Sequence, residues 1–243
     1  MLQNLFRNMP PVVKNLLIIN VLFFVAQFML PHLMEGLALY PISSEEFKPW
    51  QLATHFFMHS TSGLMHIFFN MFALVMFGAQ LEQVWGPKRF LTYYLITALG
   101  AALLHMVVNY LRLESLLAEA PAGYAQIVKE QGLELINSGK NWSNPMLAKL
   151  NGLTNTPVLG ASGAVFGLLA AFGYLFPNTE LYLMFIPVPI KAKYFVIGYA
   201  AIELYSGIAN SPGDNVAHFA HLGGALIGIV MVLIWQRQKN QFF

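Results

Sequence analysis

Long apolar runs separated by shorter polar segments form the main pattern along this chain. A helix needs roughly 20 apolar residues to cross a hydrocarbon core of about 30 Å, because each residue adds about 1.5 Å. By this measure the pattern predicts six membrane-spanning helices, over residues 12–31, 63–84, 90–111, 158–176, 193–210 and 215–236. We therefore expect one all-α polytopic membrane domain over residues 1–243.

The composition agrees with a membrane protein. Hydrophobic residues make up 57% of the chain and charged residues only 10%, with a mean hydropathy of +0.57. Soluble domains contain about 25% charged residues. The net charge of +2, without a basic run, gives little support to nucleic-acid binding. The absence of cysteine excludes disulfides, thiol nucleophiles and thiolate metal ligands.

Lysine and arginine positions predict the orientation, because cytoplasmic loops are richer in them. A cytoplasmic N-terminus would place eight of these residues inside, namely Arg7, Lys14, Lys88, Arg89, Lys191, Lys193, Arg237 and Lys239. Five would lie outside, namely Lys48, Arg112, Lys129, Lys140 and Lys149. Three of these five belong to one long loop, and long loops carry little weight. Both termini are therefore expected in the cytoplasm.

The first apolar run follows Arg7 and Lys14 and resembles a signal peptide. No small-residue cleavage site comes after it, so we interpret it as an uncleaved first span. No other targeting segment is visible, and a bacterial-type inner membrane is the expected location.

A long insertion, about residues 113–156, separates the third and fourth spans on the external side. Within it, residues 113–120 and 124–136 show helical spacing of leucines with charges between them. Such segments either lie on the membrane surface or pack against the protein as a solvated insertion. The sequence leaves both alternatives open.

A serine between glycines, Ser162 in GASGAVFG, lies at the start of the fourth apolar run. Serine at this position is usually a helix cap. Here Gly160 and Gly163 flank it and would let a substrate backbone approach closely. The first-turn N–H groups of Ala161 and Ser162 would face any negative charge that develops beside the serine.

Two histidine segments could complete a site around Ser162. His66 and Asn70 in HIFFN are four residues apart, so they share a helix face and could both donate to one anionic oxygen. The alternative is that both make polar contacts between helices. His221 in AHLGGALIG could act as a base that takes the serine proton.

Small-residue pairs supply a reason for the fourth and sixth spans to touch. Gly163 and Gly167 form one pair, and Gly224 and Gly228, on the face of His221, form another. If these faces pack, His221 could reach Ser162. His218, one turn away, is interpreted as a histidine at the membrane interface.

Acidic residues that could assist His221 are scarce. Asp214 lies in a loop, and Glu203 lies in the middle of the fifth span, where an acid points to function. Nothing in the sequence places Glu203 beside His221, so we expect a structural or gating role for it and a Ser-His dyad. His55 and His59 could form a metal pair, but two further ligands are not evident. Neither a metal nor a cofactor is expected.

These motifs resemble the rhomboid family of intramembrane serine proteases in their residues, their order and their placement on the second, fourth and sixth spans. The resemblance covers roughly residues 45–112 and 158–236 and implies a six-helix rhomboid-like bundle. It implies Ser162 as nucleophile and His221 as general base. It also implies an oxyanion hole made of His66, Asn70 and the backbone N–H groups of Ala161 and Ser162.

The chain departs from the family pattern at two positions. Many members carry a Trp-Arg pair where Trp50 is here followed by Gln51. Some members carry a tyrosine that stacks on the catalytic histidine where this chain has Phe166, which preserves stacking but lacks a hydroxyl. The family has inactive members without the serine or the histidine, whereas this chain retains both.

The resulting hypothesis is hydrolysis of a peptide bond in or near the outer end of a membrane-protein substrate's transmembrane helix. Water must reach Ser162. A polar group before and at the start of the second span is expected to line an external opening, namely His55, His59, Ser60, Thr61 and Ser62. The alternatives are a non-catalytic protein of this type that binds membrane helices, or a small transporter with polar residues along its pathway.

Overall fold

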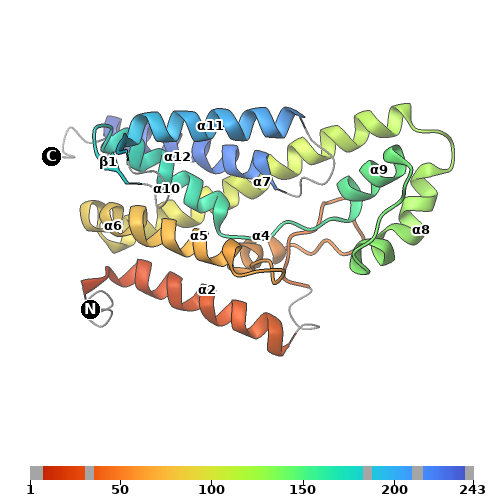
Figure 1. Cartoon of the computed structure of the whole chain (residues 1–243), viewed down its shortest axis with the longest axis horizontal. Coiled ribbons are helices and arrows are strands. Elements are labelled where there is room, and N and C mark those ends of the chain that lie inside the picture. The colour runs from red at the N-terminus through yellow and green to blue at the C-terminus, as the bar shows by residue number, and fades with distance from the viewer. Residues whose placement is uncertain (1–7, 31–35, 183–187, 210–215, 239–243) are drawn as a thin grey trace.

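The computed structural model describes residues 8–30, 36–182, 188–209 and 216–238, which form an elongated bundle of helices (Figure 1). Arg7, Asp214 and Lys239, named above, lie outside these ranges. So do the outermost residues of three expected spans, at positions 31, 210 and 215.

The helices follow one another along the chain as α2 (Pro11–Met29), α4 (Gln51–Thr54), a 3₁₀ turn (His55–Phe57), α5 (Met65–Ala73), a π-helical turn (Leu74–Gly78), α6 (Ala79–Trp85), α7 (Pro87–Glu119), α8 (Tyr124–Asn137), α9 (Pro145–Asn155), α10 (Ser162–Leu175), α11 (Ala192–Ala209) and α12 (His218–Gln238). Two short antiparallel strands, β1 (Glu180–Leu181) and β2 (Ile190–Lys191), lie between α10 and α11.

Among the described residues, four helical segments are long and apolar enough to cross a membrane: α2, the continuous helix Met65–Trp85, α7 and α12. The shorter α10 is apolar as well. Large apolar side chains on the outer faces are exposed, for example Leu22 at 61% and Ile197 at 66%, as expected for surfaces that face lipid. The expected all-α polytopic membrane fold is confirmed.

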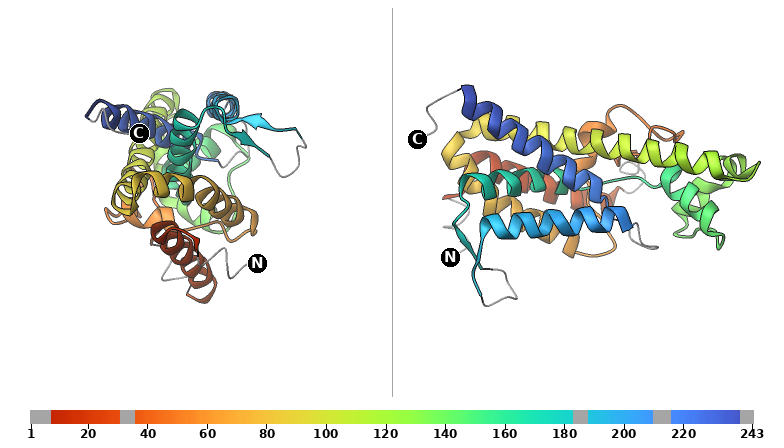
Figure 2. Two further views of the ribbon diagram at one scale, coloured as in Figure 1. Left: turned by 90° about the vertical axis from the view of Figure 1, so that its left-hand side faces the viewer. Right: turned by 90° about the horizontal axis from the view of Figure 1, so that it is seen from above.

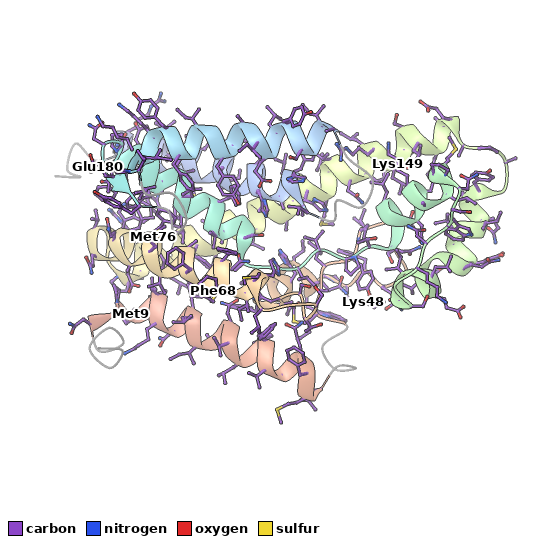
Figure 3. All side chains as sticks on the ribbon, viewed as in Figure 1. Met9, Lys48, Phe68, Met76, Lys149 and Glu180 are labelled. Atoms are coloured by element: carbon purple, nitrogen blue, oxygen red, sulfur yellow. The ribbon has the colours of Figure 1, made fainter. Side chains whose placement is uncertain are left out.

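The start of α2 and the end of α12 lie at one end of the molecule, and α8 and α9 lie at the other (Figures 1 and 2). Figure 3 shows the same polarity, since Met9 and Glu180 mark the first end and Lys48 and Lys149 the second. We call these the terminal end and the insertion end. The N-terminus of α10 points towards the insertion end.

The third long helix continues well beyond its expected end at residue 111, because α7 runs to Glu119. Residues 113–119 therefore extend α7 and do not form a separate helix. The extension, α8 and α9 share a small apolar core of Leu113, Val128, Leu147 and Leu150. The insertion thus packs around the extension of α7.

Helix α9 was not foreseen, although its start carries a recognisable signal. Asn144 precedes Pro145, and its side-chain oxygen accepts hydrogen bonds from the backbone N–H groups of Met146 and Leu147. Asparagine at the N-cap followed by proline at the first position is a common way for a helix to begin.

Helix α10 lies inside the bundle, and eleven of its residues are buried. Its glycines meet those of α12: a methyl group at Gly224 would overlap the carbonyl oxygen of Gly163, and one at Gly228 would lie 3.1 Å from Cα of Gly167. Only residues without a side chain permit this approach, so the backbones of α10 and α12 are in direct contact.

Helix α7 packs against α10 in the same manner. A Cβ atom at Gly163 would lie 2.5 Å from Cβ of Ala101, and one at Gly167 would lie 2.7 Å from Cβ of Thr97. The hydroxyl of Tyr93 donates a hydrogen bond to the carbonyl oxygen of Gly167 at 2.7 Å. The three helices therefore form a closely packed centre in which α10 is held from two sides.

A side chain from α6 caps the N-terminus of α2, which begins after Pro10 and has no capping side chain of its own. The buried carboxylate of Glu82 accepts hydrogen bonds from the backbone N–H groups of Val12 at 2.9 Å and Val13 at 2.8 Å. The anion also lies at the positive end of the α2 dipole. Glu82 thus fastens the first long helix to the second.

We predict that Gly224→Ala destabilises the protein by about 1–3 kcal/mol or more, because the added methyl group must push α12 away from α10. Gly198→Ala is the matched control, since Gly198 is a helical glycine of α11 with no atom within 4 Å of a Cβ. Thermal unfolding in detergent measures both variants. Equal melting temperatures for the two would contradict the packing described above.

We also predict that Glu82→Gln lowers stability by about 1–3 kcal/mol, because the amide loses the charge and one of two acceptor oxygens at the start of α2. Glu114→Gln, which changes an exposed carboxylate on α7, is the control. Thermal unfolding again provides the measurement. A loss no greater than that of the control would show that the cap contributes nothing.

Candidate active site

Ser162 is the first residue of α10. It directly follows a loop and is partly buried. The residue before the N-cap, Gly160, has φ of +124°, a backbone conformation that favours glycine. Its backbone N–H donates to the carbonyl oxygen of His55 at 3.0 Å. The loop is therefore anchored to the segment before α5, and it delivers the serine at a helix N-terminus.

His221 lies in the first turn of α12 and is buried. Its Nε2 atom is 2.8 Å from Oγ of Ser162, a hydrogen-bonding distance. The two residues are 59 positions apart in sequence. Gly163 directly follows Ser162, and Gly224 lies one turn beyond His221. Because these two glycines bring the helices into contact, the serine and the histidine meet.

The structure brings Glu203 beside His221, a contact that nothing in the sequence indicated. Glu203 is buried on α11, and its Oε2 atom is 2.9 Å from Nδ1 of His221 and 2.6 Å from Nδ1 of His218. His218, the first residue of α12, is partly buried and contacts Glu203 as well. The contact joins α11 and α12, and the rotation of one helix relative to the other cannot be predicted from the sequence pattern. Ser162, His221 and Glu203 thus form a hydrogen-bonded chain.

The imidazole of His221 is held on its face by Phe166. The two rings are stacked, with centroids 4.2 Å apart and an interplanar angle of 6°. Tyr199 of α11 packs against the same phenylalanine, with ring centroids 4.8 Å apart. The stacking that Phe166 was expected to preserve is therefore present, and it fixes the plane of the His221 ring.

His66 lies beside Ser162, on the far side of Gly160. A Cβ atom on Gly160 would be 3.1 Å from Nε2 of His66 and 3.6 Å from Oγ of Ser162. The backbone N–H of Ser60 donates to Nδ1 of His66 at 3.0 Å. Since Nδ1 accepts a hydrogen bond, the neutral ring carries its proton on Nε2, at the edge that shares this space with the serine.

Asn70 is buried one turn after His66, and its Nδ2 atom donates to the carbonyl oxygen of His66 at 2.8 Å. One hydrogen of this amide nitrogen is thus used within the helix. Among the described residues, the side-chain oxygen of Asn70 has no hydrogen-bond partner. The structure brings His66 to the serine, and it places Asn70 behind His66.

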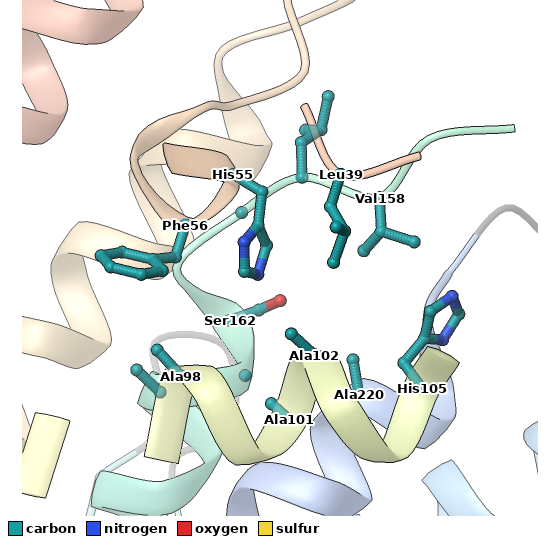
Figure 4. Close-up of a pocket in the computed structure, with 14 residues that line it drawn as sticks. Leu39, His55, Phe56, Ala98, Ala101, Ala102, His105, Val158, Ser162 and Ala220 are labelled. Carbon is teal, nitrogen blue, oxygen red and sulfur yellow. The ribbon is translucent and has the colours of Figure 1, made fainter. Parts of the chain in front are cut away.

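A small pocket adjoins Ser162 and has space for about one water molecule. Figure 4 shows the serine hydroxyl pointing into it, with His55 on one side and Ala98 and Ala102 of α7 on the other. His105 of α7 lines the same pocket further along. The pocket therefore gives the serine hydroxyl a confined space between α7 and the loop before α5.

The polar group expected to line an external opening is only partly at the surface. Thr61 and Ser62 are exposed, whereas His55 and His59 are buried. Burial lowers the pKa of each of these two histidines to about 4, so both are neutral near pH 7. Nδ1 of His55 lies 2.8 Å from the carbonyl oxygen of Gln51, which identifies it as a donor to the backbone.

One group of potential metal ligands occurs among the described residues. The ligand atoms of Glu203, His218 and His221 lie within 4.8 Å of one another. Hydrogen bonds from the two imidazoles to the carboxylate account for this arrangement. The sequence did not place Glu203 and His218 in this site. The available signals were an acid inside a span and a histidine three residues before His221.

Comparison with known proteins agrees with these motifs. A family model described as the Rhomboid domain matches residues 46–238. RHOMBOID-like protein 12, mitochondrial, from Arabidopsis thaliana is 30% identical over 243 residues, which cover 95% of this chain and 60% of that protein. Rhomboid protein 1, mitochondrial, from Saccharomyces cerevisiae is 26% identical over 242 residues, covering 93% of this chain and 56% of that protein.

Rhomboid protease AarA from Providencia stuartii is 26% identical over 198 residues, covering 76% of this chain and 56% of that protein. The chain thus spans little more than half the length of these three relatives. The first two are named as mitochondrial, so the expected bacterial-type inner membrane finds no support in them.

We predict that Phe166→Leu slows the modification of Ser162 by a fluorophosphonate between about twofold and tenfold, which corresponds to an aromatic contact of about 0.5–1.5 kcal/mol. Leucine keeps the site apolar but does not hold the plane of the imidazole. Phe68→Leu is the control, because the Phe68 ring is 45% exposed on α5. Equal rates in the wild-type chain and Phe166→Leu would argue against the role of the stack.

Proposed function

The chain belongs to the rhomboid family, and from this premise we propose that it is an active intramembrane serine protease with Ser162 as nucleophile and His221 as general base. The observation that carries the proposal is the 2.8 Å distance between Oγ of Ser162 and Nε2 of His221. A serine hydroxyl is a weak nucleophile until an adjacent base takes its proton. The neutral imidazole of His221 is positioned to do so.

In the proposed reaction, Oγ of Ser162 attacks a substrate carbonyl carbon while its proton moves to Nε2 of His221. The carbonyl oxygen becomes an anion. His221 then gives its proton to the leaving amine nitrogen as the peptide bond breaks, which leaves an acyl ester on Ser162. A water molecule, deprotonated by His221, hydrolyses the ester and restores both residues.

We propose that four donors near Ser162 stabilise the oxyanion. The backbone N–H groups of Ala161 and Ser162 lie at the start of α10, where first-turn N–H groups have no intrahelical acceptor. Nε2–H of His66 shares the space beside Ser162. Asn70 would act with its remaining amide hydrogen, next to His66. Donors of this kind are worth about 10²–10³ in rate each.

The length of α10 supports cleavage below the membrane surface. Its 14 residues span about 21 Å, less than a hydrocarbon core of about 30 Å, and Ser162 is its first residue. If the C-terminus of α10 reaches the opposite surface, the serine would lie several ångströms inside the core on the side of the insertion end. A substrate helix must unwind near that depth to expose a carbonyl, so we propose membrane-protein substrates cleaved in or near their transmembrane segments.

We further propose that α2, Met65–Trp85, α7, α10, α11 and α12 cross the bilayer as one catalytic domain, with both termini on the cytoplasmic side. The start of α2 and the end of α12 share one end of the bundle, which supports this arrangement (Figure 1). The proposed reaction uses water as a reactant, and the catalytic groups are side chains and backbone groups of this chain.

We predict that Ser162→Ala and His221→Ala each reduce cleavage of a model transmembrane substrate by about 10²-fold or more. Ser143→Ala, which changes an exposed serine of the insertion, should leave cleavage unchanged. Reconstituted protein and a fluorescent single-span substrate provide the measurement, with fluorophosphonate labelling of Ser162 as a second readout.

Cleavage at the wild-type rate by Ser162→Ala would refute the proposal. A non-catalytic helix-binding protein would bind the substrate without cleaving it in any variant. A transporter would instead show solute flux that is indifferent to Ser162→Ala.

A further inference from the structure

A buried carboxylate lies directly behind the general base of the proposed reaction. Glu203 is 4% exposed, and its Oε2 atom is 2.9 Å from Nδ1 of His221. We propose that Glu203 is a positioning residue that sets the proton and the orientation of His221, so that the site operates as Ser162, His221 and Glu203 in line. This inference rests on the proposed function and adds a third member to its machinery.

The position of the proton on His221 follows from these contacts. An ionised carboxylate can only accept hydrogen bonds, so Nδ1 of His221 must be the donor to Glu203. In a neutral imidazole the proton on Nδ1 leaves Nε2 with a free lone pair. That lone pair lies 2.8 Å from Oγ of Ser162 and can accept the serine proton. Without Glu203, the other tautomer would place a proton where the base must have none.

The carboxylate also acts after the proton has moved. When His221 takes the serine proton it becomes an imidazolium, and the charge of Glu203 lies 2.9 Å away. Opposite charges attract strongly where water is excluded. The positive charge forms in the transition state. Its stabilisation by Glu203 therefore increases the rate of the chemical step and does not change substrate binding.

His218 holds the carboxylate in the right place. Its Nδ1 atom is 2.6 Å from the same oxygen, Oε2 of Glu203. His218 and His221 are three residues apart on α12 and share a helix face. The two imidazole donors come from one rigid turn, so the carboxylate cannot rotate away from His221 without losing both bonds.

Glu82 provides a buried carboxylate for comparison. Glu82 is 2% exposed and accepts only from backbone N–H groups of α2, at the terminal end of the bundle. Both acids are satisfied by hydrogen bonds, as buried charges require. Only Glu203 is connected to the serine through an ionisable side chain. A general effect of removing buried charge and a specific effect on catalysis can thus be separated by comparing the two.

The experiment measures kcat and KM for the model transmembrane substrate in the full-length protein. Glu203→Gln keeps the size of the side chain and removes its charge. We expect kcat to fall about tenfold or more, with KM unchanged within about twofold. Fluorophosphonate labelling of Ser162, which needs no substrate binding, should slow by a similar factor. His218→Gln, which leaves the bond between His221 and Glu203 intact, should lower kcat less than Glu203→Gln does.

Glu82→Gln is the matched control, and it should lower the melting temperature while kcat per folded molecule stays unchanged. A kcat of Glu203→Gln within twofold of the wild-type value would overturn the inference. A fall in activity that only parallels the loss of folded protein, as in the control, would also overturn it. So would a rise in KM at constant kcat. These outcomes leave the proposed function standing if Ser162→Ala abolishes cleavage. A wild-type chain that neither cleaves nor labels would overturn both.

Discussion

The contact between the backbones of α10 and α12 is the constraint on which the site depends. A methyl group at Gly224 would overlap the carbonyl oxygen of Gly163, so no other residue type permits this separation. Ser162 directly precedes one of these glycines, and His221 lies one helical turn before the other. The 2.8 Å bond between serine and histidine is therefore set by packing in the helix interiors, and α7 supports it from the other side through Ala101 and Thr97.

The position, the ring plane and the hydrogen bonding of the His221 side chain are each fixed by a different part of the structure. The position of its Cα follows from α12, the plane of the ring from Phe166, and the contact at Nδ1 from Glu203. These neighbours come from three helices that follow one another in the chain, α10, α11 and α12. Pre-organisation of this kind suits a base that must meet a hydroxyl at one distance and one angle. It also explains why α11, whose inner face carries both Glu203 and Tyr199, belongs to the site and is more than a lipid-facing wall.

The apolar runs and the motif spacings predicted much of this arrangement, because both are local properties. Helices occur at all six expected positions, and Gly163, Gly167, Gly224 and Gly228 mark the faces that meet. The extension of α7 to Glu119 was missed, since the expected end of the third span followed the thickness of a bilayer and a helix can continue beyond it. The partner of Glu203 was missed for another reason: helical periodicity gives the faces of one helix, but not the rotation of one helix against the next.

Burial alone does not tell a functional acid from a structural one in this bundle. Glu82 and Glu203 are both almost fully buried and both accept two hydrogen bonds. The cost of placing a carboxylate inside a membrane protein is met in each case by its donors. The difference lies in what the donors are. Backbone N–H groups cannot pass on a change of charge, whereas an imidazole that donates at Nδ1 gains or loses affinity for a proton at Nε2. An intramembrane acid is therefore informative about function when its donors can themselves be protonated, and of these two acids only Glu203 meets that condition.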